Sequence, residues 1–125
     1  MIIELTIPGA PRTKKNHGRV VMRGGRKLHL PSEAYSEYRA RVLPLLKQWR
    51  AAFLKRPLAI AVNCAATFYR DADRGDAVGY YQGLADLLQG ASIVQDDKFI
   101  VSWDGSRLAK DASRPRVELA LTTKE

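Results

Sequence analysis

The chain has 125 residues, of which 46% are hydrophobic and 27% are charged, and its formal net charge is +8 at pH 7. This length is sufficient for one hydrophobic core and predicts a single domain over residues 1–125. The composition argues against a wholly disordered chain. The excess of positive charge predicts a polyanionic partner, usually nucleic acid and less often an anionic membrane, with solubility alone as the alternative explanation.

The first half of the chain predicts a strand, a hairpin and a helix in that order. Alternating apolar and polar residues predict a strand over 2–8, which Pro8-Gly9 should end. Two strand-like runs around Gly24-Gly25 predict a β-hairpin over 19–30. Ser32 is expected to cap a helix with an apolar stripe of Ala34, Tyr38, Val42 and Leu45/Leu46. Pro44 should kink or divide this helix because proline lacks a backbone N–H donor.

The second half predicts further strands and one more helix. The expected elements are a strand over 58–69, an acidic loop over 70–76, a helix over 77–89 ending at Gly90, and strands over 98–103 and 114–122. Cys64, the single cysteine, lies in the first of these strands and is expected to be a small core residue. The order of elements predicts a mixed α/β or α+β domain whose helices pack on one mixed sheet.

The N-terminal third of the chain is strongly basic. No acidic residue lies between Glu4 and Glu33, and this segment holds the cations Arg12, Lys14, Lys15, Arg19, Arg23, Arg26 and Lys27. Because like charges on a short segment repel one another, a bound phosphate backbone would relieve that repulsion. The segment is therefore predicted to contact phosphates, which positions a nucleic acid without reading its sequence.

Carboxylates gather at the two ends of the helix predicted over 77–89. Asp73 and Asp76 precede this helix, and Asp96 and Asp97 follow it. The helix spans about 20 Å at about 1.5 Å per residue, and an extended return over 90–96 covers a similar distance. The two pairs can thus meet and bind Mg²⁺, which prefers oxygen ligands. The alternative is that these residues cap a helix and form turns, with Asp86 as a solvated surface residue.

Several segments, in this order, resemble the RusA family of Holliday junction resolvases. They are PRTKKN (Pro11 to Asn16), PSEAY (Pro31 to Tyr35), PRVEL (Pro115 to Leu119), and the series Asp76, Gln82, Asp86, Leu88, Val94 and Asp96-Asp97. Members of this family are small dimeric endonucleases with a mixed α and β fold. The resemblance implies a homodimer that cuts four-way junctions or other branched DNA, with Mg²⁺ or Mn²⁺ as cofactor.

The family's core pattern D-x-D-N-x-x-K assigns individual roles by this resemblance. Three aspartates hold the metal and the lysine assists cleavage; Asp76 matches the first ligand, and Asp97, with Asp96 beside it, matches the downstream pair. Val78 and Gln82 stand in place of the second aspartate and the lysine. Asp73 or Asp96 could replace the missing ligand, and Lys98 or Lys110 the missing cation. The alternative is a protein that binds nucleic acid but cuts it poorly or not at all.

The N-terminal sequence MIIELTIPG has no charged leader followed by an apolar core, and no long apolar run follows it. The protein is therefore expected in the cytoplasm, without a membrane partner.

Overall fold

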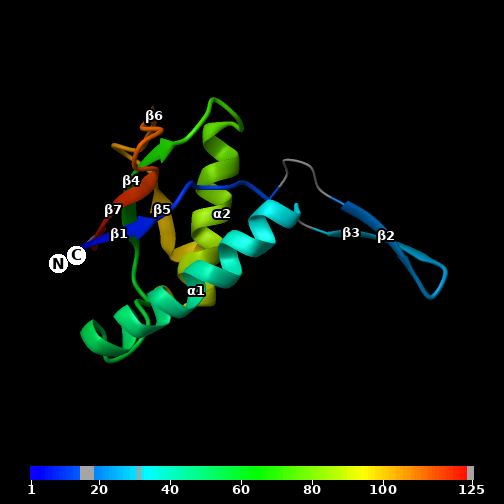
Figure 1. Ribbon diagram of the computed structural model, residues 1–125. Helices are drawn as coiled ribbons and strands as arrows, with labels where there is room; N and C mark the ends of the chain where they lie inside the picture. The colour runs from blue at the N-terminus through cyan, green and yellow to red at the C-terminus, as the bar shows by residue number, and fades with distance from the viewer. Residues whose placement is uncertain (15–18, 31, 124–125) are drawn as a thin grey trace.

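The computed structural model describes residues 1–14, 19–30 and 32–123, with only the backbone described for Arg19, Val21, His29 and Leu30 (Figure 1). Its elements are β1 (Ile2–Pro8), β2 (Arg19–Arg23), β3 (Arg26–Leu30), α1 (Glu33–Phe53), β4 (Val62–Arg70), α2 (Ala77–Gly90), the 3₁₀ turn η1 (Asp97–Phe99), β5 (Ile100–Ser102), β6 (Arg107–Lys110) and β7 (Arg116–Thr123).

The main sheet has the strand order β1-β7-β4-β5, and β6 also pairs with β4. Strand β7 is antiparallel to both β1 and β4, whereas β5 and β6 run parallel to β4. Both α1 and α2 pack on this mixed sheet (Figure 1). The predicted class, a small domain with helices on one mixed sheet, is confirmed. Among the described residues, no helix has both the length and the apolar character that crossing a membrane requires.

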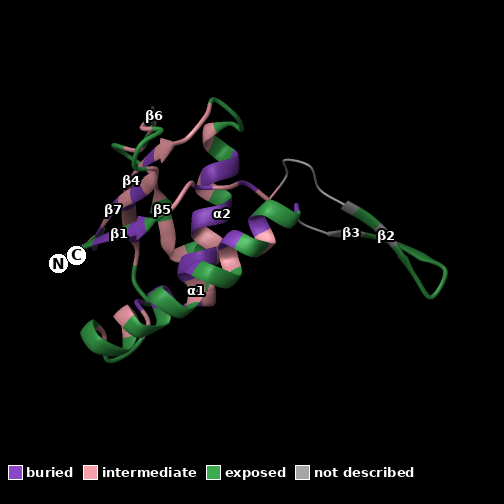
Figure 2. Ribbon diagram, viewed as in Figure 1, coloured by how far each residue is buried: buried purple, intermediate pink, exposed green. Residues whose placement is uncertain are grey.

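The core lies between the sheet and the two helices (Figure 2). Along β4, every second residue is buried, among them Cys64 and Phe68. Tyr38 and Val42 of α1 and Leu88 of α2 close the core from the helix side. Burial raises the pKa of the Cys64 thiol to about 12, so this cysteine is an inert core residue, as the sequence predicts.

Helix α1 begins as predicted, since the Ser32 hydroxyl accepts a hydrogen bond from the Tyr35 amide. Of the two effects expected of Pro44, a kink or a division, the division is wrong, because α1 runs unbroken to Phe53. Proline leaves the carbonyl of the residue four positions earlier without its helical donor. Both Pro44 and Ala40 are exposed, so water can satisfy that carbonyl. The apolar stripe also differs from the prediction: Ala34 and Leu45 are exposed, and Tyr35 is buried.

Some predicted boundaries are displaced. The strand predicted from residue 58 begins at Val62, and Leu58 forms only an isolated bridge with Val94. The strand predicted over 98–103 is reduced to β5 because η1 precedes it. Strand β6 was not predicted, since RLAK is short and has no clear alternation.

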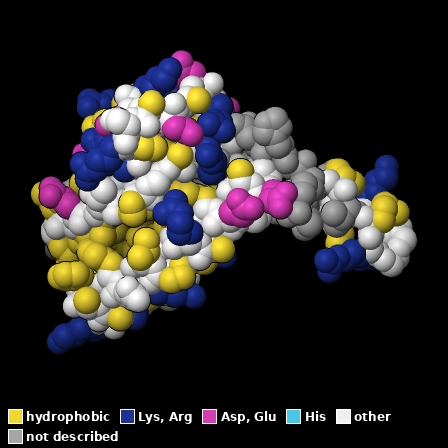
Figure 3. Space-filling model, in the orientation of Figure 1, with side chains coloured by type: hydrophobic (Ala, Val, Ile, Leu, Met, Phe, Trp, Pro, Cys, Tyr) yellow, Lys and Arg dark blue, Asp and Glu magenta, His cyan; other side chains and the backbone are white. Residues whose placement is uncertain are grey.

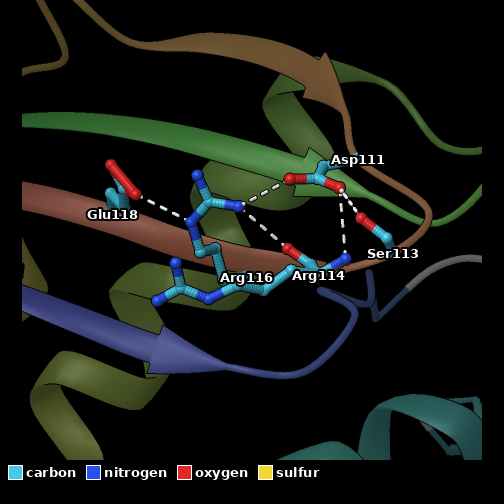
Figure 4. A network of polar contacts seen from close by, with 5 residues as sticks. All are labelled: Asp111, Ser113, Arg114, Arg116 and Glu118. Carbon is cyan, nitrogen blue, oxygen red and sulfur yellow. Dashed lines mark hydrogen bonds and ion pairs between the residues drawn. The ribbon is translucent and has the colours of Figure 1, made fainter.

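Arg116 organises the turn that leads into β7 (Figure 4). Its guanidinium lies 3.8 Å from the centroid of the Tyr69 ring, and its Nη1 atom lies 2.9 Å from an oxygen of Asp111. Its Nε atom donates to Glu118 at 2.7 Å, and Nη1 also donates to the Arg114 carbonyl. Arg116 neutralises two acids and closes a turn, so its charge serves the fold.

Candidate nucleic-acid interface

Strands β2 and β3 form a separate two-stranded sheet, here called the arm (Arg19–Leu30), which projects from the domain on the side away from the two chain ends (Figure 1). The predicted hairpin is confirmed. Gly24 and Gly25 form its turn with φ angles of 56° and 76°. Two successive positive φ angles are typical of the two-residue turn whose twist matches antiparallel strands, and glycine adopts them without strain.

The arm carries exposed cations and contains no acidic residue (Figure 3). Arg23 and Arg26 lie directly opposite one another, and Lys27 pairs with Met22 in the same ladder. Within the described part of the structure, none of these three cations has an ion-pair partner. Like charges placed opposite one another on a hairpin destabilise it. The arm therefore presents positive charge that a phosphate backbone would neutralise.

The base of the arm is held against both helices. The Lys14 Nζ atom lies 3.1 Å from Asp86, and Arg39 Nε and the Tyr35 hydroxyl each donate to Asp86 at 2.9 Å. Ser32 adds two hydrogen bonds to this base. Its amide donates to the Lys14 carbonyl, and its hydroxyl donates to the carbonyl of the residue before Lys14. The prediction that Asp86 is a solvated surface residue is wrong, because it anchors the segment from which the arm extends.

Two glycines on α2 allow this close approach. A β-carbon on Gly79 would lie 3.3 Å from the Thr13 side chain, and one on Gly83 would lie 3.1 Å from Tyr35 and 3.3 Å from the Arg12 carbonyl. The spacing of four residues places both glycines on one face of α2. The pair of glycines, four residues apart, is the signal in the sequence for a segment packed on α2.

The predicted phosphate-binding residues therefore fall into three groups. Arg12 and Lys14 lie at the base of the arm in ion pairs with Asp71 (3.6 Å) and Asp86, respectively. Arg23, Arg26 and Lys27 are exposed on the arm. Lys15 and the side chain of Arg19 lie outside the described residues.

Replacing Asp86 by asparagine is expected to lower the free energy of unfolding by about 2 kcal/mol at pH 7, because Lys14 and Arg39 lose their shared anion. Burial alone would raise the pKa of Asp86, but hydrogen bonds from Arg39, Lys14 and Tyr35 outweigh this effect and hold the pKa below its ordinary value. The stabilisation is thus full above about pH 5 and is lost as the pH falls through the lowered pKa.

Urea unfolding of both proteins from pH 7 to pH 2.5 measures this difference. Asp104→Asn is the matched control, since Asp104 is exposed and its side chain makes no ion pair in the described part of the structure. A difference between wild type and Asp86→Asn that stays constant down to the lowest pH would contradict the assignment.

Each of the predicted metal ligands makes local contacts of its own within the described residues. Asp76 caps α2, with its carboxylate accepting from the Gly79 amide at 2.8 Å. The Asp97 amide instead donates to the side chain of Gln89, near the other end of α2. Asp96 accepts from the Lys98 amide, and the exposed Asp73 lies 3.5 Å from Arg70.

No group of three or more His, Cys, Asp or Glu side chains that could hold a metal occurs in the described part of the chain. Because Asp76 is engaged as a helix cap, and valine and glutamine supply neither an anionic ligand nor a fixed cation, the residues present do not fit the magnesium site that the resemblance implies.

Three positions of the resembled motif nevertheless share one hollow of about 320 Å³ beside α2. Val78, Gln82 and Asp97 line it together with Tyr81, Ala85, Ile100 and Trp103. The rings of Tyr81 and Trp103 stack with centroids 4.8 Å apart and planes 7° apart. Both rings are partly exposed in this hollow.

No protein-family model matches the chain, and no curated protein matches it significantly. The resemblance to the RusA family therefore depends on the quoted residues alone.

Proposed function

We propose that the protein binds nucleic acid through the arm, and that branched DNA such as a four-way junction is its partner. The observation that supports this proposal is the projecting hairpin whose cations Arg23, Arg26 and Lys27 are exposed and unpaired among the described residues. Contacts of this kind neutralise phosphates and release counterions, so the affinity falls steeply as salt rises. Preference for a branch would come from the shape of the DNA, because backbone contacts carry no sequence information.

Metal-dependent cleavage of the bound DNA is the second candidate function. It is favoured by the hollow that collects Val78, Gln82 and Asp97, the positions that match motif residues of the resembled family. It is opposed by the chemistry of two of these side chains and by the engagement of Asp76 as a helix cap. We place binding first for this reason.

A homodimer is part of the proposal, and the free edge of β1 supports it. Hydrogen bonds at both ends of β1, Gly9 to Pro115 and Thr123 to Met1, show that the odd-numbered residues bond to β7. The even-numbered residues therefore direct their backbone groups outward, along the free edge. Pro8, the last residue of β1, is the exception, because proline has no N–H to donate and its carbonyl accepts from Arg41.

An apolar groove of about 240 Å³ runs beside this edge, between β1 and α1 (Figure 3). Its lining includes Leu5, Leu45 and Trp49. Antiparallel pairing of two β1 strands would be self-complementary, as a two-fold axis requires. Sedimentation equilibrium tests this part of the proposal, and a monomer at the highest concentration used for binding would contradict it.

The function is tested with a labelled four-way junction and a duplex of the same sequence, over a range of salt concentrations, with and without Mg²⁺ or Mn²⁺. We expect tighter binding to the junction and a steep loss of affinity with salt. Symmetric nicks that require the metal and disappear in Asp97→Asn would establish the second candidate. Failure to bind either DNA at low salt would refute the proposal as a whole.

A further inference from the structure

We propose that the hollow beside α2 binds an unpaired nucleobase, which stacks on the aromatic side chains and meets Gln82 and Asp97 with its polar edge. This inference rests on the proposed binding of nucleic acid and deepens it, because it names the part of the nucleic acid that enters this site. It assigns a ligand to the site where the residues do not fit a metal.

The apolar lining suits a flat ligand. Tyr81 and Trp103 stack on one another, and Val78, which is 58% exposed, forms the side of the hollow together with Ile100. The volume of about 320 Å³ is within the range of small-ligand sites. Nucleobases are planar and apolar on both faces, and proteins that bind single-stranded nucleic acid commonly stack them on aromatic side chains.

The polar rim suits the edge of a base. The exposed Gln82 amide offers both donors and an acceptor, and the Asp97 carboxylate offers acceptors only. Such groups pair with the amino and ring nitrogen atoms of a base edge. The negative charge of Asp97 would repel a phosphate, so the sugar-phosphate backbone should remain outside the hollow. The exposed Lys98, which follows Asp97 in sequence, is available to the sugar-phosphate backbone outside the hollow.

The placement of the hollow also agrees with a ligand delivered by the arm. The base of the arm packs on the face of α2 that carries Gly79, Gly83 and Asp86, and the hollow lies on the face that carries Val78 and Gln82. At 3.6 residues per turn these faces differ by about 100° around the helix and so are neighbours. The hollow adjoins β5, at the opposite end of the main sheet from β1, so pairing through β1 would leave it open.

The test compares three labelled DNA duplexes by fluorescence anisotropy at one salt concentration. One contains a single unpaired nucleotide, the second carries an abasic residue in its place, and the third is fully paired. We expect the wild type to bind the unpaired base about tenfold more tightly than the abasic residue, as expected for one stacked base.

Val78→Phe, which fills the hollow, should reduce this preference to less than about twofold and leave binding of the paired duplex unchanged. Val101→Phe is the matched control, because Val101 is similarly exposed (55%) on β5 but does not line the hollow. Circular dichroism and sedimentation of both variants check that fold and oligomeric state are retained.

Equal affinity of the wild type for the unpaired base and the abasic residue would overturn this inference alone. An unchanged preference in Val78→Phe would also overturn it, since the base would then bind elsewhere. A change in oligomeric state specific to Val78→Phe would assign the hollow to contact between copies of the chain instead. Absence of binding to all three duplexes would refute the proposed function together with this inference.

Discussion

Simultaneous replacement of Arg23, Arg26 and Lys27 by alanine is expected to weaken DNA binding roughly 100-fold at 0.1 M salt. Each cation that contacts a phosphate contributes about 0.9 to the slope of log K against log salt, so the slope should become shallower by about 2.7. The fold should not change, because these side chains are exposed on a hairpin that forms its own two-stranded sheet. Fluorescence anisotropy over a salt series measures both quantities.

The matched control removes three positive charges from the other end of the molecule. Lys47, Lys55 and Arg56 are all exposed and lie in the C-terminal half of α1 and just beyond it. Their replacement by alanine changes the net charge by the same amount as the triple variant of the arm. Any loss of affinity that both triple variants share is therefore an effect of the overall charge. Equal losses would show that the arm has no special part in binding.

Phe68→Ala is expected to lower the free energy of unfolding by about 3–5 kcal/mol, the range for truncation of a buried phenylalanine. Phe68 is only 1% exposed, and its ring centroid lies 5.4 Å from that of Tyr80 and 5.8 Å from that of Tyr81. Tyr81 in turn stacks on Trp103, so the cavity would open beneath the aromatic side of the hollow. Urea unfolding monitored by circular dichroism measures the change.

Phe53→Ala serves as the control for this variant. Phe53 is 69% exposed at the end of α1 and lies 5.3 Å, between ring centroids, from Trp49. Its truncation should cost less than about 1 kcal/mol, because little buried surface is lost. A loss as large as that of Phe68→Ala would show that the C-terminal turn of α1 is buried against a second molecule.

Local signals in the sequence determined most of the elements. Alternation over residues 2–8, the glycine pair at the hairpin turn and Ser32 before α1 each act through neighbouring residues, and the structure confirms all three. The division expected at Pro44 is wrong because the cost of a proline depends on whether water reaches the carbonyl it leaves free, which sequence does not reveal.

The candidate site was less predictable. Asp86, placed by pattern on a solvated surface, instead holds Lys14 and Arg39, because its neighbours come from segments distant in sequence. The expected meeting of Asp76 and Asp97 depended on the path of residues 90–96. In the structure the chain turns at Ser92, which has a φ of 60°, the Asp97 amide donates to Gln89, and Asp97 lines the hollow together with Val78.

The sequence alone therefore determined the mixed α and β class, the basic arm and its positive charge, since periodicity and charge are properties of short segments. Only the tertiary structure decided which charges remain free and which residues share a surface. Arg12 and Lys14 are paired at the base of the arm, whereas Arg23 and Arg26 are not paired among the described residues. Likewise, Val78, Asp97 and Trp103 line one hollow only because β5 pairs with β4 beside α2. Contacts between segments distant in sequence depend on packing, which no local pattern encodes.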